Sequence, residues 1–375
     1  MDGNSLAFTA IRGIQAGRAY YVIMVPLKAV PRLFKFEDDD VPAEFRAQRV
    51  LNKTRVPVIA DYISSNADEY ILSSLCASVD GEMDFVPAGA GGQRHVGKLL
   101  IDIGAMILIN DGQHRRAAIE EAVRQRPTLG NETISVVIFA DHGLKRSQQM
   151  FADLNIHATR PTKSLGLFYD QRDAVACLCR DVLMKRIPLF RDYTCVDRNT
   201  LSNRTTKLIT FSSLHGATQR LLGVRDVEEL SEDEEDVALR YWSAVVEAMP
   251  DWQRVQTRDV ATVELRTTTI HAHGVAMQAL GSAGRHLIEG YSCDWEPRVE
   301  GLRRINWSKS YMELWDGRAM EGGRIRTAGM NIQLVTNAIL QTYGVPLSEA
   351  AQEAEDQHSA RMAQAVSVTP LRNLG

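Results

Sequence analysis

The strand-like segments of this chain are confined to its first 141 residues. Runs rich in β-branched and aromatic residues occur at residues 19–27, 70–81, 98–110 and 132–141, and such runs between turn residues are typical of strands. From about residue 165 onward, apolar residues recur at helical spacing instead. Because strands must pair in a sheet and each helix must bury an apolar face, this segregation predicts an α+β fold. We expect a mixed α/β N-terminal lobe and a mostly helical C-terminal lobe.

Length and composition fit this organisation. A chain of 375 residues with 45% hydrophobic and 24% charged side chains can bury a substantial core. We expect a first domain over residues 8–165 and a helical domain over residues 166–345. Residues 346–375 are polar and rich in Ala, Gln and Glu, so they predict a partly disordered tail.

The cysteines and the N-terminus indicate the compartment. Five irregularly spaced cysteines argue against a disulfide framework. The first residues lack the layout of a signal peptide, and no apolar run reaches membrane-spanning length. We therefore expect a reduced, cytoplasmic protein without a membrane partner.

A strand pattern gives way to a helix pattern within ILINDGQHRRAAIEEA, residues 107–122. The N-terminus of a helix attracts anions because its N–H groups are unpaired and its dipole is positive there. Gly112 lets the backbone approach a bound group, Arg115 can form two hydrogen bonds to phosphate, and His114 titrates near neutral pH. Asp111 is either the helix N-cap or a carboxylate that handles a metal or proton. Spacing alone favours a phosphate site and a solvated, capped helix start about equally.

Residues 111–115 spell Asp-Gly-Gln-His-Arg, and this motif resembles the signature of the DGQHR-domain proteins. The surrounding sequence resembles the DndB family of the bacterial DNA sulfur (phosphorothioate, dnd) modification system. Four further segments carry this resemblance, which spans roughly residues 8–340. They are AIRGIQAGRAYYV (10–22), RAQRVLNKTRVPVIADYI (46–63), MFADLNIHATRPTKSLGLFYDQRD (150–173) and INWSKS (305–310).

The DGQHR domain is similar to the ParB/sulfiredoxin superfamily, in which a turn at a helix N-terminus binds nucleotide phosphates. The resemblance implies a ParB/sulfiredoxin-like N-terminal lobe with an anion site at this turn. Gln113 stands where sulfiredoxin has its reactive cysteine, which excludes sulfinic-acid reduction through a cysteine here. The predicted phosphate- or nucleotide-binding residues are Gly112, Gln113, His114, Arg115, Arg116, Arg49, Arg55 and Asn155.

A second candidate group lies in QQMFADLN, residues 148–155. Asp153 and Asn155 are suited to hold a metal or a ribose near the turn, or alternatively to cap the helix and fix the next loop. The resemblance places this segment in the family signature and favours a site. For Arg49 and Arg55, the alternative to phosphate contact is a solvated face.

Charge is segregated along the C-terminal lobe, although the whole chain carries a net charge of only -4. Residues 160–220 contain eleven Lys/Arg against five Asp, whereas residues 221–260 contain four Arg against eleven Asp/Glu. Such segregation can present one basic face to DNA, with scattered solvated charges as the alternative. The residues we predict to contact DNA are Arg160, Lys163, Arg198, Arg204 and Lys207.

Other chemically suggestive residues favour structural roles. Trp307 and Trp315 lie among arginines, but tryptophan covers the core more often than it stacks on bases. His271 and His273 are two residues apart in a helical segment, which is poor geometry for metal ligands. We predict no metal site from the protein's own residues.

These observations lead to two functions. The resemblance implies a DNA-binding regulatory protein of DNA sulfur modification, a transcriptional repressor of the modification operon, whose partners are DNA and other modification proteins. The alternative is a ParB-like nucleoside triphosphate hydrolase or DNA nickase with magnesium, in which Asp111, His114, Arg115 and Asp153 are catalytic. The chain lacks the GxxxxGK[ST] phosphate-binding motif, so we favour a regulator that is not an enzyme. Because repressors are usually symmetric, we expect a homo-oligomer.

Overall fold

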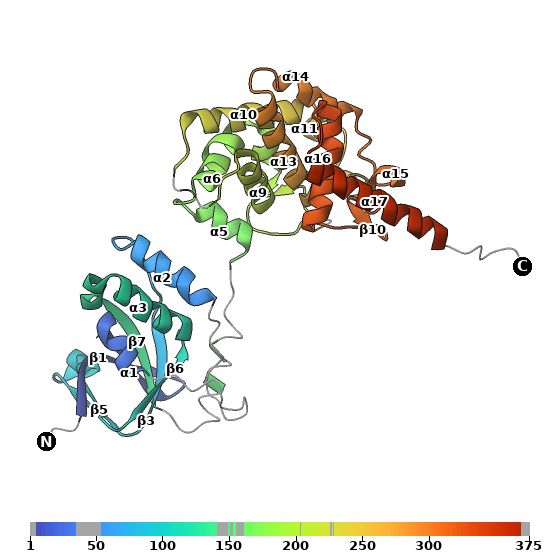
Figure 1. Ribbon diagram of the computed structural model, residues 1–375. Helices are drawn as coiled ribbons and strands as arrows, with labels where there is room; N and C mark the ends of the chain where they lie inside the picture. Colours follow the sequence, from blue (N-terminus) through green and yellow to red (C-terminus); the bar gives the residue numbers. More distant parts are fainter. Residues whose placement is uncertain are drawn as a thin grey trace, which may run out of the picture. The chain divides into compact units, whose positions relative to one another are not determined.

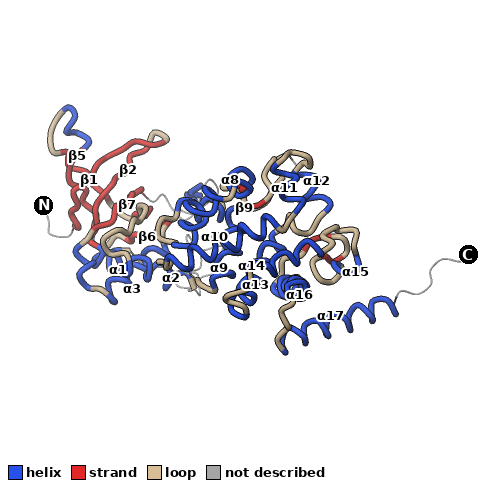
Figure 2. Tube along the Cα trace, turned by 90° about the horizontal axis from the view of Figure 1, so that it is seen from above, coloured by secondary structure: helices blue, strands red, loops and turns tan. Residues whose placement is uncertain are grey.

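The computed structural model describes residues 5–34, 54–140, 149–150, 153–154, 161–202, 204–225, 227 and 229–368. The chain divides into two compact units, Met1–Thr159 and Arg160–Gly375 (Figure 1). A large sheet lies in the first unit and most of the helices lie in the second (Figure 2). This division confirms the predicted α+β class.

The first unit is built on a seven-stranded sheet in the order β4-β5-β1-β2-β7-β3-β6. Strands β3 and β7 are parallel, and the other neighbouring strands are antiparallel. The strands are β1 (Ser5–Gln15), β2 (Arg18–Pro26), β3 (Leu75–Asp80), β4 (Met83–Pro87), β5 (Val96–Asp102), β6 (Met106–Asp111) and β7 (Thr133–Ala140). The sequence predicts strands within residues 8–30, where β1 and β2 lie, and it predicts the other strands except β4, whose Asp84 and Pro87 weaken the strand pattern.

Helices cover one face of this sheet. The cross-strand neighbours Ala10, Ile23, Val136 and Leu75 are all buried and form one core with residues of the helices. These helices are α1 (Val30–Leu33), α2 (Arg55–Ser65) and α3 (Gln113–Gln125), with short 3-10 turns at Leu27–Ala29, Gly91–His95 and Pro127–Asn131. α2 and α3 lie side by side (Figure 1). The sequence pattern predicts a helix from about residue 113 to residue 125, and α3 has these bounds.

The second unit is mostly helical. Its longer helices are α9 (Phe211–Leu222), α10 (Glu232–Glu247), α13 (Gly274–Gly290), α16 (Gly329–Tyr343) and α17 (Glu349–Val368). The shorter helices are α5 (Lys163–Tyr169), α6 (Ala174–Cys177), a π-helical segment (Leu178–Leu183), α7 (Met184–Arg186), α8 (Pro188–Tyr193), α11 (Pro250–Gln256), α12 (Thr262–Thr268), α14 (Glu296–Val299), a 3-10 segment (Glu300–Arg304) and α15 (Met312–Trp315). Four two-residue strands complete it: β8 (Thr194–Cys195), β9 (Ile209–Thr210), β10 (Met320–Glu321) and β11 (Arg324–Ile325).

Helix α13 packs against both α9 and α16. Gly281 allows the close approach to α9, because a Cβ at this position would overlap the backbone carbonyl oxygen of Ala217. Around these helices, Trp307 and Trp315 stack on each other and are buried, as the sequence predicts. Buried His271 accepts a hydrogen bond from Trp252 at Nδ1 (3.0 Å), which confirms its structural role.

The apolar pattern of residues 260–281 predicts one helix, but the structure breaks it between α12 and α13. The Ile270 N–H donates to the Trp307 carbonyl at 2.8 Å, and Thr269 forms a β-bridge with Ser308. These tertiary bonds replace the helical ones. Three successive β-branched threonines precede the break, and their low helix propensity reduces the free energy lost when the helix ends there.

The segment after Ser348, which the sequence predicts to be a polar tail, forms α17. Glu355 binds the Arg318 guanidinium through both carboxylate oxygens (2.6 and 2.7 Å), and the Asn337 amide also donates to it at 3.0 Å. Only 12% of each charged side chain is exposed. Burial disfavours the carboxylate, but the bonds from Arg318 outweigh it and lower the pKa of Glu355. A buried ion pair therefore joins α17 to α16 and the segment after α15.

We expect Glu355→Ala to destabilise the protein by about 3–5 kcal/mol, because it leaves the Arg318 charge buried without its partner. Urea unfolding should show this change. The double variant Arg318→Met/Glu355→Leu should lose much less stability, since it removes both charges and keeps their volume. Equal losses in the two variants would contradict this account of the pair.

Candidate nucleic-acid interface

The turn at residues 111–113 is fixed by the fold of the first unit. β6 ends at Asp111, Gly112 is the N-cap of α3 with φ +105°, and α3 begins at Gln113. A Cβ at Gly112 would clash with the Leu75 side chain, so the turn requires glycine for both its conformation and its packing. Asp111 is therefore not the N-cap, which corrects that alternative.

Arg115 bonds to the protein itself. Its guanidinium donates to the carbonyl oxygens of Ser73 (2.7 Å) and Ser74 (2.9 Å), to the Ser73 hydroxyl and to Asp111 Oδ2 (2.6 Å). These bonds hold the segment that leads into β3 against the start of α3. Behind them, burial together with the Asp111 carboxylate raises the pKa of the Cys76 thiol to about 12.

The neighbouring side chains of the motif also point inward. Buried Gln113 donates to the carbonyl oxygens of Ile109 and Asn110, each at 3.3 Å. Arg116 donates to the carbonyl oxygens of Pro31 (2.7 Å) and Phe34 (3.2 Å) and pairs with Glu120. His114 is half-buried. The side chains of the turn thus tie α3 to the sheet and to α1, and the anion site stays a prediction that rests on the backbone N–H groups of the first helical turn.

The other predicted residues of the first unit do not all join this turn. Arg55 is exposed at the start of α2. Asp153 accepts a hydrogen bond from Gln149 (2.6 Å) and lines a cavity of about 260 Å³ with Arg18 and Phe139. Arg49, Asn155 and the predicted DNA contact Arg160 lie outside the described residues. Among the residues that are described, no cluster of His, Cys, Asp and Glu is suited to hold a metal ion.

In the second unit, the predicted DNA contacts Arg198, Arg204 and Lys207 lie together in one loop. This basic loop, residues 196–208, connects the parallel strands β8 and β9. Arg198 and Arg204 are exposed, with 60% of the Arg198 side chain open to solvent. Lys207 is half-buried and donates to the Asp192 carbonyl at 2.8 Å. The exposed arginines can contact a ligand, whereas Lys207 fixes the base of the loop.

A buried arginine holds the basic loop from within the unit. Arg266, which is 8% exposed, donates to the carbonyl oxygens of Ser202 (3.0 Å), Thr205 (3.0 Å) and Lys207. The start of α5 holds the other side: the Thr162 hydroxyl donates to the Asp197 carbonyl at 3.0 Å, and the Ser164 N–H donates to Asn199 Oδ1 at 2.9 Å. Nothing in the sequence indicates the role of Arg266, because a single arginine in a short helix carries no motif.

The Arg266 carbonyl is itself held by two basic side chains. His273 Nε2 lies 2.8 Å from this oxygen and Lys309 Nζ donates to it at 2.6 Å. Burial, reinforced by the charge of Lys309, lowers the pKa of His273 to about 4 despite the bond to the carbonyl. His273 is therefore neutral at physiological pH, and it contributes to the support of the basic loop in that form.

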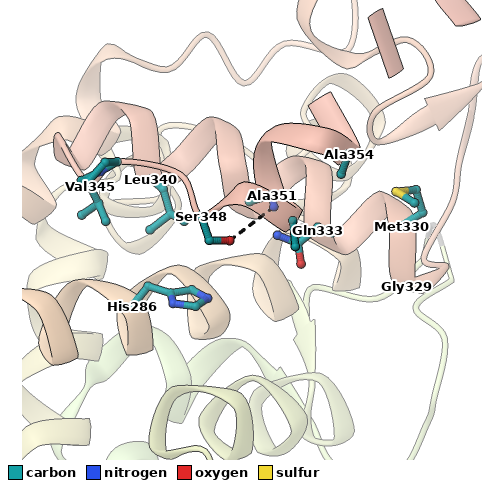
Figure 3. A pocket seen from close by; sticks show the side chains of 11 residues that line it. His286, Gly329, Met330, Gln333, Leu340, Val345, Ser348, Ala351 and Ala354 are labelled. Carbon is teal, nitrogen blue, oxygen red and sulfur yellow. Dashed lines mark hydrogen bonds between the residues drawn. The ribbon is translucent and has the colours of Figure 1, made fainter. Parts of the chain in front are cut away.

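A cavity of about 530 Å³ with a mixed polar and apolar lining also lies in this unit, between α13, α16 and α17 (Figure 3). Met330, Leu340, Val345 and Ala354 line it, and none of its lining residues carries a carboxylate or a guanidinium group. Its chemistry does not suit a nucleic acid.

Replacing Arg115 tests its role as an internal tie. Arg115→Ala removes the donor to two backbone carbonyls and to Asp111, and we expect it to destabilise the first unit by about 2–4 kcal/mol. Urea unfolding followed by circular dichroism measures this loss. The exposed Arg55→Ala serves as the control, and an Arg115→Ala protein as stable as this control would exclude the structural role.

The buried His273 predicts a pH dependence of stability. Its pKa is lower in the folded protein than in the unfolded chain, so the unfolded chain binds more protons between about pH 6.5 and pH 4. Stability should therefore fall as the pH drops through this window, by up to about 3 kcal/mol from His273. Relative to wild type, His273→Gln should flatten the curve of unfolding free energy against pH. The exposed His286→Gln is the control, and parallel curves for wild type and His273→Gln would contradict this account.

Comparison with known proteins gives one result. The model of the DndB family, described as DNA-sulfur modification-associated, matches residues 8–346. The search of curated proteins and the search of solved structures gave no match. The family match covers both units, from β1 to the end of α16. The protein therefore belongs to the DndB family of DNA-sulfur modification-associated proteins.

Proposed function

We propose that this protein is a DNA-binding regulator of DNA sulfur modification that represses transcription of the modification operon. Family membership supports the link to DNA sulfur modification. The observation that carries the DNA-binding part is the basic loop, which exposes Arg198 and Arg204 while the buried Arg266 holds its backbone. On this proposal its partners are DNA and other proteins of the modification system.

The construction of the loop suits contact with a DNA backbone. Arginine, threonine and serine side chains are common donors to phosphate oxygens, and the loop contains all three types. Its backbone is held by bonds to Arg266, Thr162 and Ser164 before any ligand arrives. Less conformational entropy is then lost on binding, so more of the contact energy appears as affinity.

The alternative function, a nucleotide hydrolase or DNA nickase, has less support. It requires Arg115 to bind phosphate, but this guanidinium bonds to the Ser73 and Ser74 carbonyl oxygens and to Asp111. An enzyme of this kind would have to break those bonds on binding its substrate. We therefore favour the regulator.

We expect the double variant Arg198→Gln/Arg204→Gln to bind DNA more weakly and with less salt dependence. Each lost phosphate contact lowers the slope of log affinity against log salt by about 0.9, so the slope should fall by about 2. Fluorescence anisotropy with a fragment of the modification-operon promoter, at several salt concentrations, measures both quantities. Arg361→Gln in α17, an exposed arginine outside the loop, is the matched control.

The same titrations with random DNA of equal length test repression. A regulator should bind its operator at least about a thousandfold more tightly than random DNA. Equal affinities would refute specific repression. An unchanged salt slope in the double variant would remove the basic loop from the interface.

A further inference from the structure

A cavity of about 630 Å³ runs along α9 and α13 in the second unit, next to the basic loop. Four cationic side chains line it: Lys163, Arg220, Arg225 and Arg285. Serine, threonine and glutamine side chains supply further hydrogen-bonding groups, and among the described residues that line it there is no Asp or Glu. The combination of cations and neutral donors suits a phosphate group.

The dipole of α9 does not account for this concentration of charge. Arg220, Arg225 and Arg285 gather at the C-terminal end of α9, where a helix carries roughly half a negative charge. Glu289 pairs with Arg285 at 2.7 Å and offsets one cation. Among the residues that the structure describes here, two arginines and Lys163 then remain, which is more positive charge than half a unit can balance.

Internal packing orients two of the arginines. Arg220 Nε donates to Gln278 Oε1 at 2.8 Å, which joins α9 to α13. The Arg285 guanidinium lies so close to Gly223 that a Cβ there would overlap its Nη1 atom. Arg225 is exposed, and the described part of the chain shows no bond to its side chain. Arg220 and Arg285 are thus oriented by their neighbours, whereas Arg225 is available to a ligand.

The cavity is continuous with the basic loop through the start of α5. Lys163 lines the cavity, and its neighbours Thr162 and Ser164 bond to residues 197 and 199 of the loop. On the other side, the Ser164 hydroxyl lies 2.9 Å from the hydroxyl of Ser212, which also lines the cavity. Eight residues of α9 separate Ser212 from Arg220, a length of about 12 Å. The loop and the cavity therefore form one extended basic strip.

We propose that this cavity binds phosphate, and that in the DNA complex it receives backbone phosphates beyond those contacted by the basic loop. The part of this inference that concerns DNA rests on the proposed function. DNA is favoured over a free phosphate compound because the cations continue along the surface into the loop.

The test uses the full chain with Arg220→Gln/Arg225→Gln and with Arg225→Gln alone, and Arg361→Gln is again the control. Arg225→Gln removes a charge without breaking a bond seen among the described residues, so it should fold like wild type. Promoter DNA is titrated at several salt concentrations, and pyrophosphate is titrated by calorimetry. We expect the double variant to bind DNA on the order of tenfold more weakly, with a salt slope lower by about 1 to 2. Arg225→Gln should show about half of that change in slope, and the control should match wild type.

The outcomes separate this inference from the proposed function. If wild type binds DNA and both cavity variants keep its affinity and salt slope, the cavity is not part of the interface and the inference fails alone. If wild type binds no DNA, the proposed function fails. The pyrophosphate titration then decides whether the cavity binds phosphate. Pyrophosphate binding that is lost in the double variant would then support a phosphate site for a free compound, whereas no binding to wild type would overturn the inference as well.

Discussion

The basic loop depends on one buried guanidinium group. A loop without regular structure leaves backbone carbonyl groups that need donors, and an interior arginine offers five N–H groups in a fixed plane. Arg266 uses this geometry to bind the carbonyl oxygens of Ser202, Thr205 and Lys207 together. Its own carbonyl is held by His273 and Lys309, so the support extends into the break between α12 and α13.

An arginine that binds backbone carbonyl oxygens also occurs in the first unit. It indicates that the arginine of the DGQHR motif has a structural role. Arg115 binds the carbonyl oxygens of Ser73 and Ser74 in the way that Arg266 binds its loop. A side chain that closes internal bonds is costly to redirect to a ligand, because its carbonyl partners would be left unpaired. Chemical type alone does not distinguish such an arginine from an exposed one like Arg198. The two kinds of arginine are distinguished by their burial and by their hydrogen-bond partners.

Local patterns were sufficient to predict much of the fold. α3, β5, β6 and β7 follow from hydrophobic period and turn residues, because their signals lie within the segment itself. The break at residues 269–273 depends on Trp307 and Ser308, which are distant in sequence, so no local pattern indicates it. The tail has the composition of a solvated segment, yet the ion pair between Arg318 and Glu355 and the bonds from Asn337 to Ala351 and Glu355 join its helix to the rest of the unit.

Some features of the candidate site could be predicted from the sequence and others could not. The exposure of Arg198 and Arg204 agrees with the charge pattern, since a basic and polar run gains most by staying in water. The inward direction of Arg115 and the presence of Arg266 behind the loop were not predictable, because their carbonyl partners lie 41 to 64 residues away in sequence. Hydrogen bonds that close such distances are set by the tertiary fold.

Part of the acidic stretch that follows α9 is engaged in local interactions. Ser231 and Glu234 form a capping box at the start of α10, and four acidic residues in its first turn lie at the positive end of the helix dipole. Arg240 pairs with Asp236 and with Glu296. Screening at physiological salt limits the field of the remaining acidic residues to a length of about 8 Å. The strip therefore keeps an excess of positive charge even though the chain as a whole is acidic.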